Sequence, residues 1–141
     1  MPDITVVMKA NPSEVEQYIK LFAIRFECSI SEYEDGQLLL PPYMLRKHGL
    51  LFMPSADAWI VSREDDATTW EDYLLVLSAH ELGEQFGGVI YYGNRKTPVE
   101  PDSAQFATFD QYVEFVLDVT PGILKETKKM WMYSHQKRSV R

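Results

Sequence analysis

The segment His80-Glu81-Leu82-Gly83-Glu84 holds the side chains best suited to catalysis or metal binding. On a helix, His80 and Glu84 are four residues apart and share one face, with Glu81 beside them. Imidazole and carboxylate groups bind zinc, so the cluster predicts at most a metal site or an acid–base pair. The zincin motif H-E-x-x-H is not met, because Glu84 replaces its second histidine. A solvated helix face explains the same residues and predicts that His80→Ala changes stability little and removes no metal.

Other motifs of enzymes and nucleotide-binding proteins are missing. Cys28 is the single cysteine, so it forms no internal disulfide, and without a local base signature we expect a small buried thiol. Gly87-Gly88 precedes a predicted strand rather than a helix, so it predicts no phosphate loop. The sequence therefore indicates no cofactor and favours a non-enzymatic protein.

Charge is the second informative feature. The chain has a net charge of −7, and residues 125–141 hold six Lys or Arg against one acid, so residues 1–124 carry −12. A negative charge of this size on residues 1–124 disfavours binding to nucleic acid and anionic membranes, and it attracts basic proteins. Its acidic groups are predicted on a hairpin tip, in a loop and in the first turn of a helix. They consist of Glu32, Glu34 and Asp35, then Glu64, Asp65 and Asp66, then Glu71 and Asp72.

Two interpretations of these acidic groups stay open. Solubility together with helix-dipole complementarity requires no partner. The alternative is a docking surface for a basic protein partner, for which aromatic residues would supply the anchors. The candidate anchors are Tyr33, Tyr43, Trp59, Tyr91 and Tyr92, although we expect most of them in the core.

The C-terminal tail is basic and contains Trp131 and Tyr133 between its charges. Nucleic acid, an acidic surface of another subunit, or simple charge complementarity at a helix end would each suit it. It is the one segment that suits nucleic acid. A homodimer is compatible with the sequence.

The segment from Thr68 to Gly93 predicts the element around which the fold is organised. Thr68 and Glu71 have the spacing of a capping box, and apolar residues then recur at helical spacing from Trp70 to Phe86. Gly87-Gly88 should end this helix, and the apolar run Val89–Tyr92 is typical of a central strand.

Similar local signals place the other elements. Asn11-Pro12 should start a helix that ends near Phe26, and Glu34-Asp35-Gly36 should turn a hairpin. Thr108 and Gln111 predict a second capping box. The expected strands are Ile4–Ala10, Cys28–Tyr33, Gln37–Leu40, Leu50–Met53 and Trp59–Ser62, with a turn at Pro54–Asp57 and a last helix from Ile123 to about Tyr133. Tyr43–His48 fits either one helical turn closed by Gly49 or an irregular crossing.

This order predicts a single α+β domain over residues 1–141, with a basic tail that frays from about residue 134. The expected architecture is a ferredoxin-like split βαβ sheet of about five or six short, largely antiparallel strands. Helices would lie on one face, and two C-terminal helices would cover an edge or the other face. Neither a secretory signal nor a membrane span is recognisable, so we expect a cytoplasmic protein.

The leading hypothesis for function is an acidic binding protein of the immunity or antitoxin type that neutralises a basic, nuclease-like toxin. One alternative is a metal-dependent or acid–base enzyme that uses His80, Glu81 and Glu84. Another is a mobile-element or nucleic-acid regulator that acts through the basic tail.

Overall fold

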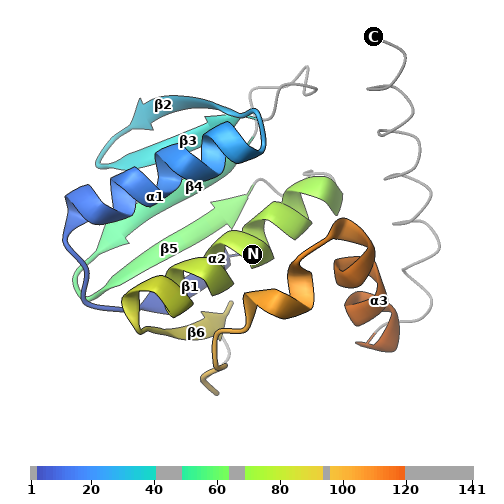
Figure 1. Ribbon diagram of the computed structural model, residues 1–141. Helices are drawn as coiled ribbons and strands as arrows, with labels where there is room; N and C mark the ends of the chain where they lie inside the picture. Colours follow the sequence, from blue (N-terminus) through green and yellow to red (C-terminus); the bar gives the residue numbers. More distant parts are fainter. Residues whose placement is uncertain (1–2, 41–48, 64–68, 94–95, 120–141) are drawn as a thin grey trace, which may run out of the picture.

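The computed structural model describes residues 3–40, 49–63, 69–93 and 96–119 (Figure 1). Its strands are β1 (Asp3–Val7), β2 (Ser29–Tyr33), β3 (Gly36–Leu40), β4 (Leu50–Ser55), β5 (Ala58–Arg63) and β6 (Val89–Tyr92). Its helices are α1 (Pro12–Arg25), α2 (Thr69–Phe86), the 3-10 helix η1 (Ser103–Phe106) and α3 (Phe109–Val119). The expected last helix, the basic tail and Tyr43–His48 lie outside the described residues.

The six strands form one antiparallel sheet with the order β2-β3-β4-β5-β1-β6. If the β2–β3 hairpin is set aside, β1, α1, β4, β5, α2 and β6 form the split βαβ arrangement in which β1 separates β5 from β6. The ferredoxin-like α+β prediction is therefore confirmed, with β2 and β3 extending the sheet beyond β4. The prediction of a central strand at Val89–Tyr92 is wrong, because β6 lies at the edge. Ile90 is nevertheless fully buried, and its bridge to Val99 protects this edge.

Local capping signals explain where the helices begin and end. The Asn11 side chain accepts from the backbone N–H of Ser13, and Pro12 occupies the first helical position of α1. Gly87 has a positive φ of 66°, which ends α2 in the left-handed conformation that glycine adopts without strain. The predicted capping box at Thr108 is also present, because its hydroxyl accepts from the N–H of Gln111.

The hairpins differ from the predicted ones in detail. Tyr33 pairs with Gly36, so Glu34 and Asp35 form the β2–β3 loop, and Glu34 has the positive φ of 54°. Gly36 is required because an added Cβ would clash with the Phe52 carbonyl oxygen. In the next hairpin, the pairing of Ser55 with Ala58 extends β4 past its predicted end at Met53. Conversely, β1 ends at Val7, before the predicted end at Ala10.

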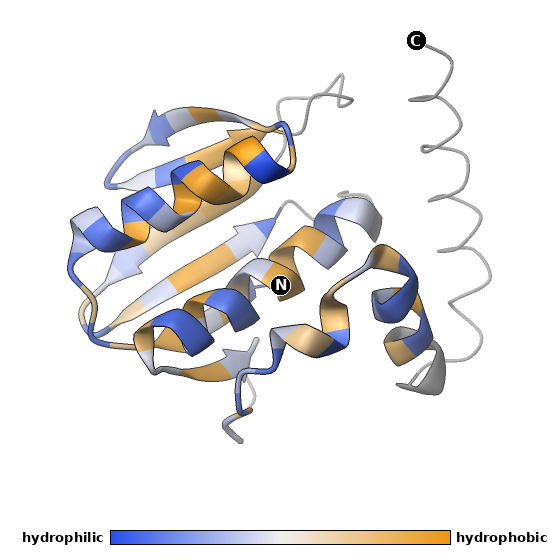
Figure 2. Ribbon diagram, in the orientation of Figure 1, coloured by the Kyte–Doolittle hydropathy of each residue, from blue (hydrophilic) through white to orange (hydrophobic). Residues whose placement is uncertain are grey.

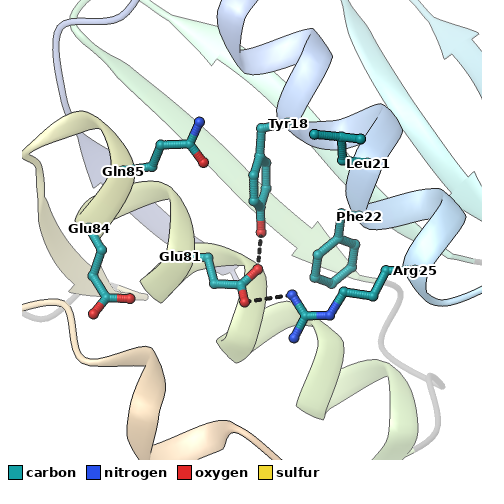
Figure 3. A pocket seen from close by; sticks show the side chains of 7 residues that line it. All are labelled: Tyr18, Leu21, Phe22, Arg25, Glu81, Glu84 and Gln85. Carbon is teal, nitrogen blue, oxygen red and sulfur yellow. Dashed lines mark hydrogen bonds and ion pairs between the residues drawn. The ribbon is translucent and has the colours of Figure 1, made fainter.

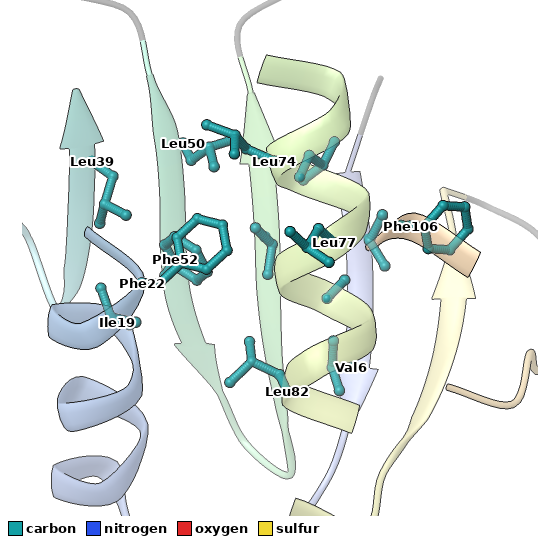
Figure 4. Packing of buried hydrophobic residues seen from close by; sticks show 14 of the residues in the cluster. Val6, Ile19, Phe22, Leu39, Leu50, Phe52, Leu74, Leu77, Leu82 and Phe106 are labelled. Carbon is teal, nitrogen blue, oxygen red and sulfur yellow. The ribbon is translucent and has the colours of Figure 1, made fainter. Parts of the chain in front are cut away.

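Figure 1 shows α1 and α2 on the same face of the sheet, and the core lies between these two layers. In Figure 4, Phe52 of β4 packs near Phe22 of α1, and Leu77 projects from α2 over the sheet. Figure 2 shows that hydrophobic residues concentrate on the central strands, whereas the turn between β2 and β3 is hydrophilic. None of the described helices is both long and apolar enough to cross a membrane.

α2 is packed on two sides, which the sequence did not predict. The sheet covers one side, and η1 and α3 contact the other. Tyr73 of α2 meets Phe109 of α3 edge to face, with ring centroids 5.5 Å apart, and Phe106 of η1 lies against His80 at 4.8 Å. As a result, polar residues of α2 such as Glu71 and Ser78 are buried together with its apolar residues.

Candidate functional site

His80 lies inside the protein, so the prediction of a solvated face is wrong for this residue. Its side chain is 2% exposed. The backbone N–H of Asp102 donates to Nδ1 over 2.9 Å, and Nε2 lies 2.5 Å from the Tyr92 hydroxyl. Because Nδ1 accepts, the ring proton belongs on Nε2 and is donated to Tyr92. Burial lowers the pKa of His80, although the negative charges of Glu84 and Asp102 oppose this shift.

Glu81 takes part in a separate set of contacts between α1 and α2 (Figure 3). The Tyr18 hydroxyl donates to Oε1 over 2.7 Å, and Arg25 Nη1 pairs with Oε2 at 2.7 Å. Burial, and then the negative charge of Glu81, raise the pKa of Tyr18, so its phenol remains a protonated donor at neutral pH. Sequence reasoning missed this pair because its members are 63 positions apart and no local motif joins them.

A groove of about 480 Å³ lies over these contacts, lined by the residues labelled in Figure 3. Its polar floor is occupied by the Tyr18–Glu81–Arg25 contacts, in which each charge already has an opposite charge or a donor. Arg25 also lies 4.8 Å from the centroid of the Phe26 ring. The arrangement therefore joins two helices through the Glu81 carboxylate.

The structure does not assemble His80, Glu81 and Glu84 into one site. His80 points toward Tyr92 and Asp102, Glu81 toward α1, and Glu84 is exposed. Within the described ranges, no group of three or more His, Cys, Asp or Glu side chains is arranged to hold a metal ion.

Cys28 fits the prediction of a small buried thiol only in part. It is half-buried, immediately before β2, and its sulfur lies 3.7 Å from the Phe26 carbonyl oxygen. Burial, with a smaller contribution from the negative charge of Glu71, raises the pKa of the thiol to about 11. The thiolate that a nucleophile requires is therefore suppressed at neutral pH.

The acidic groups differ in where they lie. Glu71 is 0% exposed, so the expectation of a surface position is wrong for it. Asp72 is half-buried and forms an ion pair with Arg63 of β5. Burial raises the pKa of Asp72, while the Arg63 charge opposes that rise. Both acids thus lie in the first turn of α2, and Asp72 joins that turn to the sheet.

Glu34 and Asp35, by contrast, are exposed at the tip of the β2–β3 hairpin, where the sequence placed them. Glu32 of β2 is exposed as well, and all five residues of β2 are exposed. Tyr33 lies among these acids with 49% of its surface exposed. We call Glu32, Tyr33, Glu34 and Asp35 the acidic hairpin tip. Since β2 is the first strand of the sheet order, no described strand pairs with its outer edge.

The other aromatic candidates have different surroundings. Trp59 is in the core, Tyr92 is bound to His80, and Tyr91 is half-buried on β6. Tyr43, the predicted acidic loop Glu64–Asp66 and the basic tail lie outside the described residues. Tyr33 is therefore the candidate anchor that is most exposed among those described.

Comparison with known proteins finds no matching family model, no matching curated protein and no matching solved structure.

Proposed function

We propose that this chain is a small, non-enzymatic, acidic binding domain that neutralises a basic protein, in the manner of an immunity or antitoxin protein against a nuclease-like toxin. The acidic hairpin tip is the observation that carries the proposal. It presents three exposed carboxylates and one exposed tyrosine at the end of an edge strand.

Charge and an exposed aromatic residue both support this role. The active site of a protein that cuts nucleic acid must attract phosphates, so it is cationic and complements an acidic plug. Acids at the rim of an interface accelerate encounter, while a tyrosine at its centre supplies contact area with little loss of side-chain entropy. Tyr33 and its acidic neighbours combine these two parts within one hairpin.

The test compares two variants with the same change in charge. Glu32→Gln, Glu34→Gln and Asp35→Asn together remove three charges from the acidic hairpin tip. The matched control, Glu16→Gln, Asp57→Asn and Glu100→Gln, removes three exposed charges elsewhere. Each protein is immobilised and exposed to lysate of the native host at about 50 mM salt and then at about 300 mM salt.

We expect the wild type and the control to retain a basic protein that elutes as salt rises, and the hairpin variant to lose it. With that protein purified, stopped-flow mixing should give the hairpin variant an association rate roughly tenfold lower than that of the control at low salt. The nuclease activity of the purified basic protein should fall when the wild-type chain is added. Equal retention by both variants, or retention that salt does not weaken, would refute the proposal.

A further inference from the structure

The face of the sheet opposite α1 and α2 is a second surface to consider beside the acidic hairpin tip. Ile4 and Val6 of β1 point toward the helices and are buried, so Thr5 and Val7 point the other way. Val7 is 39% exposed. No described helix lies on this opposite face in Figure 1, and we call it the open face.

The register shows that one row of side chains crosses the open face from edge to edge. Thr5 pairs with Tyr91 on one side and with Ile60 on the other, and Ile60 pairs with Met53. The row then continues through Gly36, which lies against Met53, to Tyr33. It joins all six strands and contains no charged residue.

Charge distinguishes the open face from the rest of the protein. The described residues hold five basic and seventeen acidic side chains, so the described parts of two copies carry charge of the same sign and repel each other. Among the strand residues that point to the open face, Asp3 at the end of β1 is the only charged one. A second copy can therefore approach here with the least repulsion.

The size of the open face also suits a pair of copies. Six strands spaced about 4.8 Å apart and roughly 17 Å long give an area on the order of 500 Å² per copy. Two copies would bury about 1,000 Å², close to the lower limit for a specific interface, so the association should be weak. Antiparallel sheets pack face to face through such rows in many proteins.

We infer that the open face binds a second copy of this chain in a face-to-face, two-fold symmetric dimer. This inference goes beyond the proposed function and does not depend on it, because the two surfaces share only Tyr33 and the dimer should respond to salt in the opposite way. Salt screens the repulsion between two acidic copies and should strengthen the dimer, whereas it should weaken the binding of a basic partner.

Sedimentation equilibrium of the full chain, from about 5 µM to about 500 µM, tests the dimer. The apparent mass should rise from 16.3 kDa toward twice that value. Val7→Lys and Ile60→Lys should each weaken association at least tenfold. Ile24→Lys, at a residue of α1 that is 75% exposed, is the matched control and should dimerise like the wild type. Because Val7 is already partly exposed, Val7→Lys is the variant expected to keep its fold.

Three results would overturn the inference. The first is a wild type that stays monomeric at every concentration. The second is equal association by the wild type and Val7→Lys. The third is a monomeric protein whose stability falls with Val7→Lys but not with Ile24→Lys. That result would mean that another part of the same chain, and not a second copy, covers the open face. The variant with a neutralised acidic hairpin tip should still dimerise. Failure of the proposed dimer can therefore be distinguished from failure of the proposed binding to a basic protein.

Discussion

Both ring nitrogens of His80 are engaged inside the fold, so the native state needs a neutral imidazole. Nδ1 accepts from the N–H of Asp102, and a proton added there would set one donor against another. Glu84 and Asp102 provide some compensating negative charge, but burial dominates and lowers the pKa of His80. His80→Ala should therefore lower stability by roughly 1–3 kcal/mol, because buried hydrogen-bonding partners would be left unsatisfied.

This environment predicts a stability that falls with acid. The pKa of His80 is lower in the folded than in the unfolded chain, so the unfolded chain takes up the proton first. Stability contributed by neutral His80 is thus complete above about pH 6.5 and is lost below it, by at most about 1.4 kcal/mol per pH unit. Urea unfolding midpoints between about pH 8 and pH 5 would measure the loss.

His80→Gln is the control that separates the pH dependence due to His80 from that of the other titrating groups. Glutamine keeps a polar side chain but does not titrate. It should be less stable than the wild type near pH 8, but its stability should fall less on acidification. Parallel pH profiles for the two proteins would contradict the assignment.

At the scale of elements, α2 is the helix on which the other layers are built. Leu77 faces the sheet and is 1% exposed, whereas Trp70 packs against Phe26, which follows α1, and stacks on Phe109 of α3 at a centroid distance of 5.5 Å. These two side chains therefore report on the two packed sides of one helix.

We expect Leu77→Ala to lower the free energy of unfolding by roughly 2–5 kcal/mol and Trp70→Ala by roughly 3–5 kcal/mol, because each leaves a void in a packed layer. Urea denaturation at neutral pH measures both. Gln85→Ala, at an exposed position near the end of α2, is the control and should stay within about 0.5 kcal/mol of the wild type. A loss below about 0.5 kcal/mol for Trp70→Ala would mean that the outer layer adds little stability.

Local signals explain why the elements were predictable and why their surroundings were not. Asn11 beside Pro12, and Thr108 before Gln111, mark helix starts through contacts within a few residues. The hairpin tip at Glu34 and Asp35 was located in the same way. The burial of His80 and Glu71, however, depends on η1, α3 and the sheet, which lie far along the chain. Polarity alone therefore suggested a solvated face where the fold provides a second packed side.

On the scale of the whole molecule, the excess of acidic over basic residues is the dominant electrostatic property. Repulsion among the excess acidic side chains destabilises the folded state, although ion pairs such as Arg25–Glu81 and Arg63–Asp72 offset part of this repulsion. The proposed partner would relieve this repulsion with opposite charge, whereas the proposed dimer would limit the added repulsion by using a face with few charges.

Modest salt should consequently stabilise the protein. Raising NaCl from about 20 mM to about 200 mM should increase the free energy of unfolding by roughly 0.5 kcal/mol, because screening weakens the repulsion between acids. Urea is the suitable denaturant, since guanidinium is itself a salt. The hairpin variant with three charges removed should gain less from salt than the wild type. A midpoint that falls with salt in both proteins would show that attractive ion pairs outweigh the repulsion.

The position of β1 between β5 and β6 also sets the order in which the protein can form during synthesis. Ile4 pairs with Val61 and with Tyr92, so this first strand emerges long before either of its neighbours. At about 5–20 residues per second, roughly 4 to 18 seconds separate the synthesis of Ile4 from that of Tyr92. The β2–β5 meander, whose pairings are local, can form during this interval, while the N-terminal strand remains open to chaperones or to mispairing with a neighbouring nascent chain.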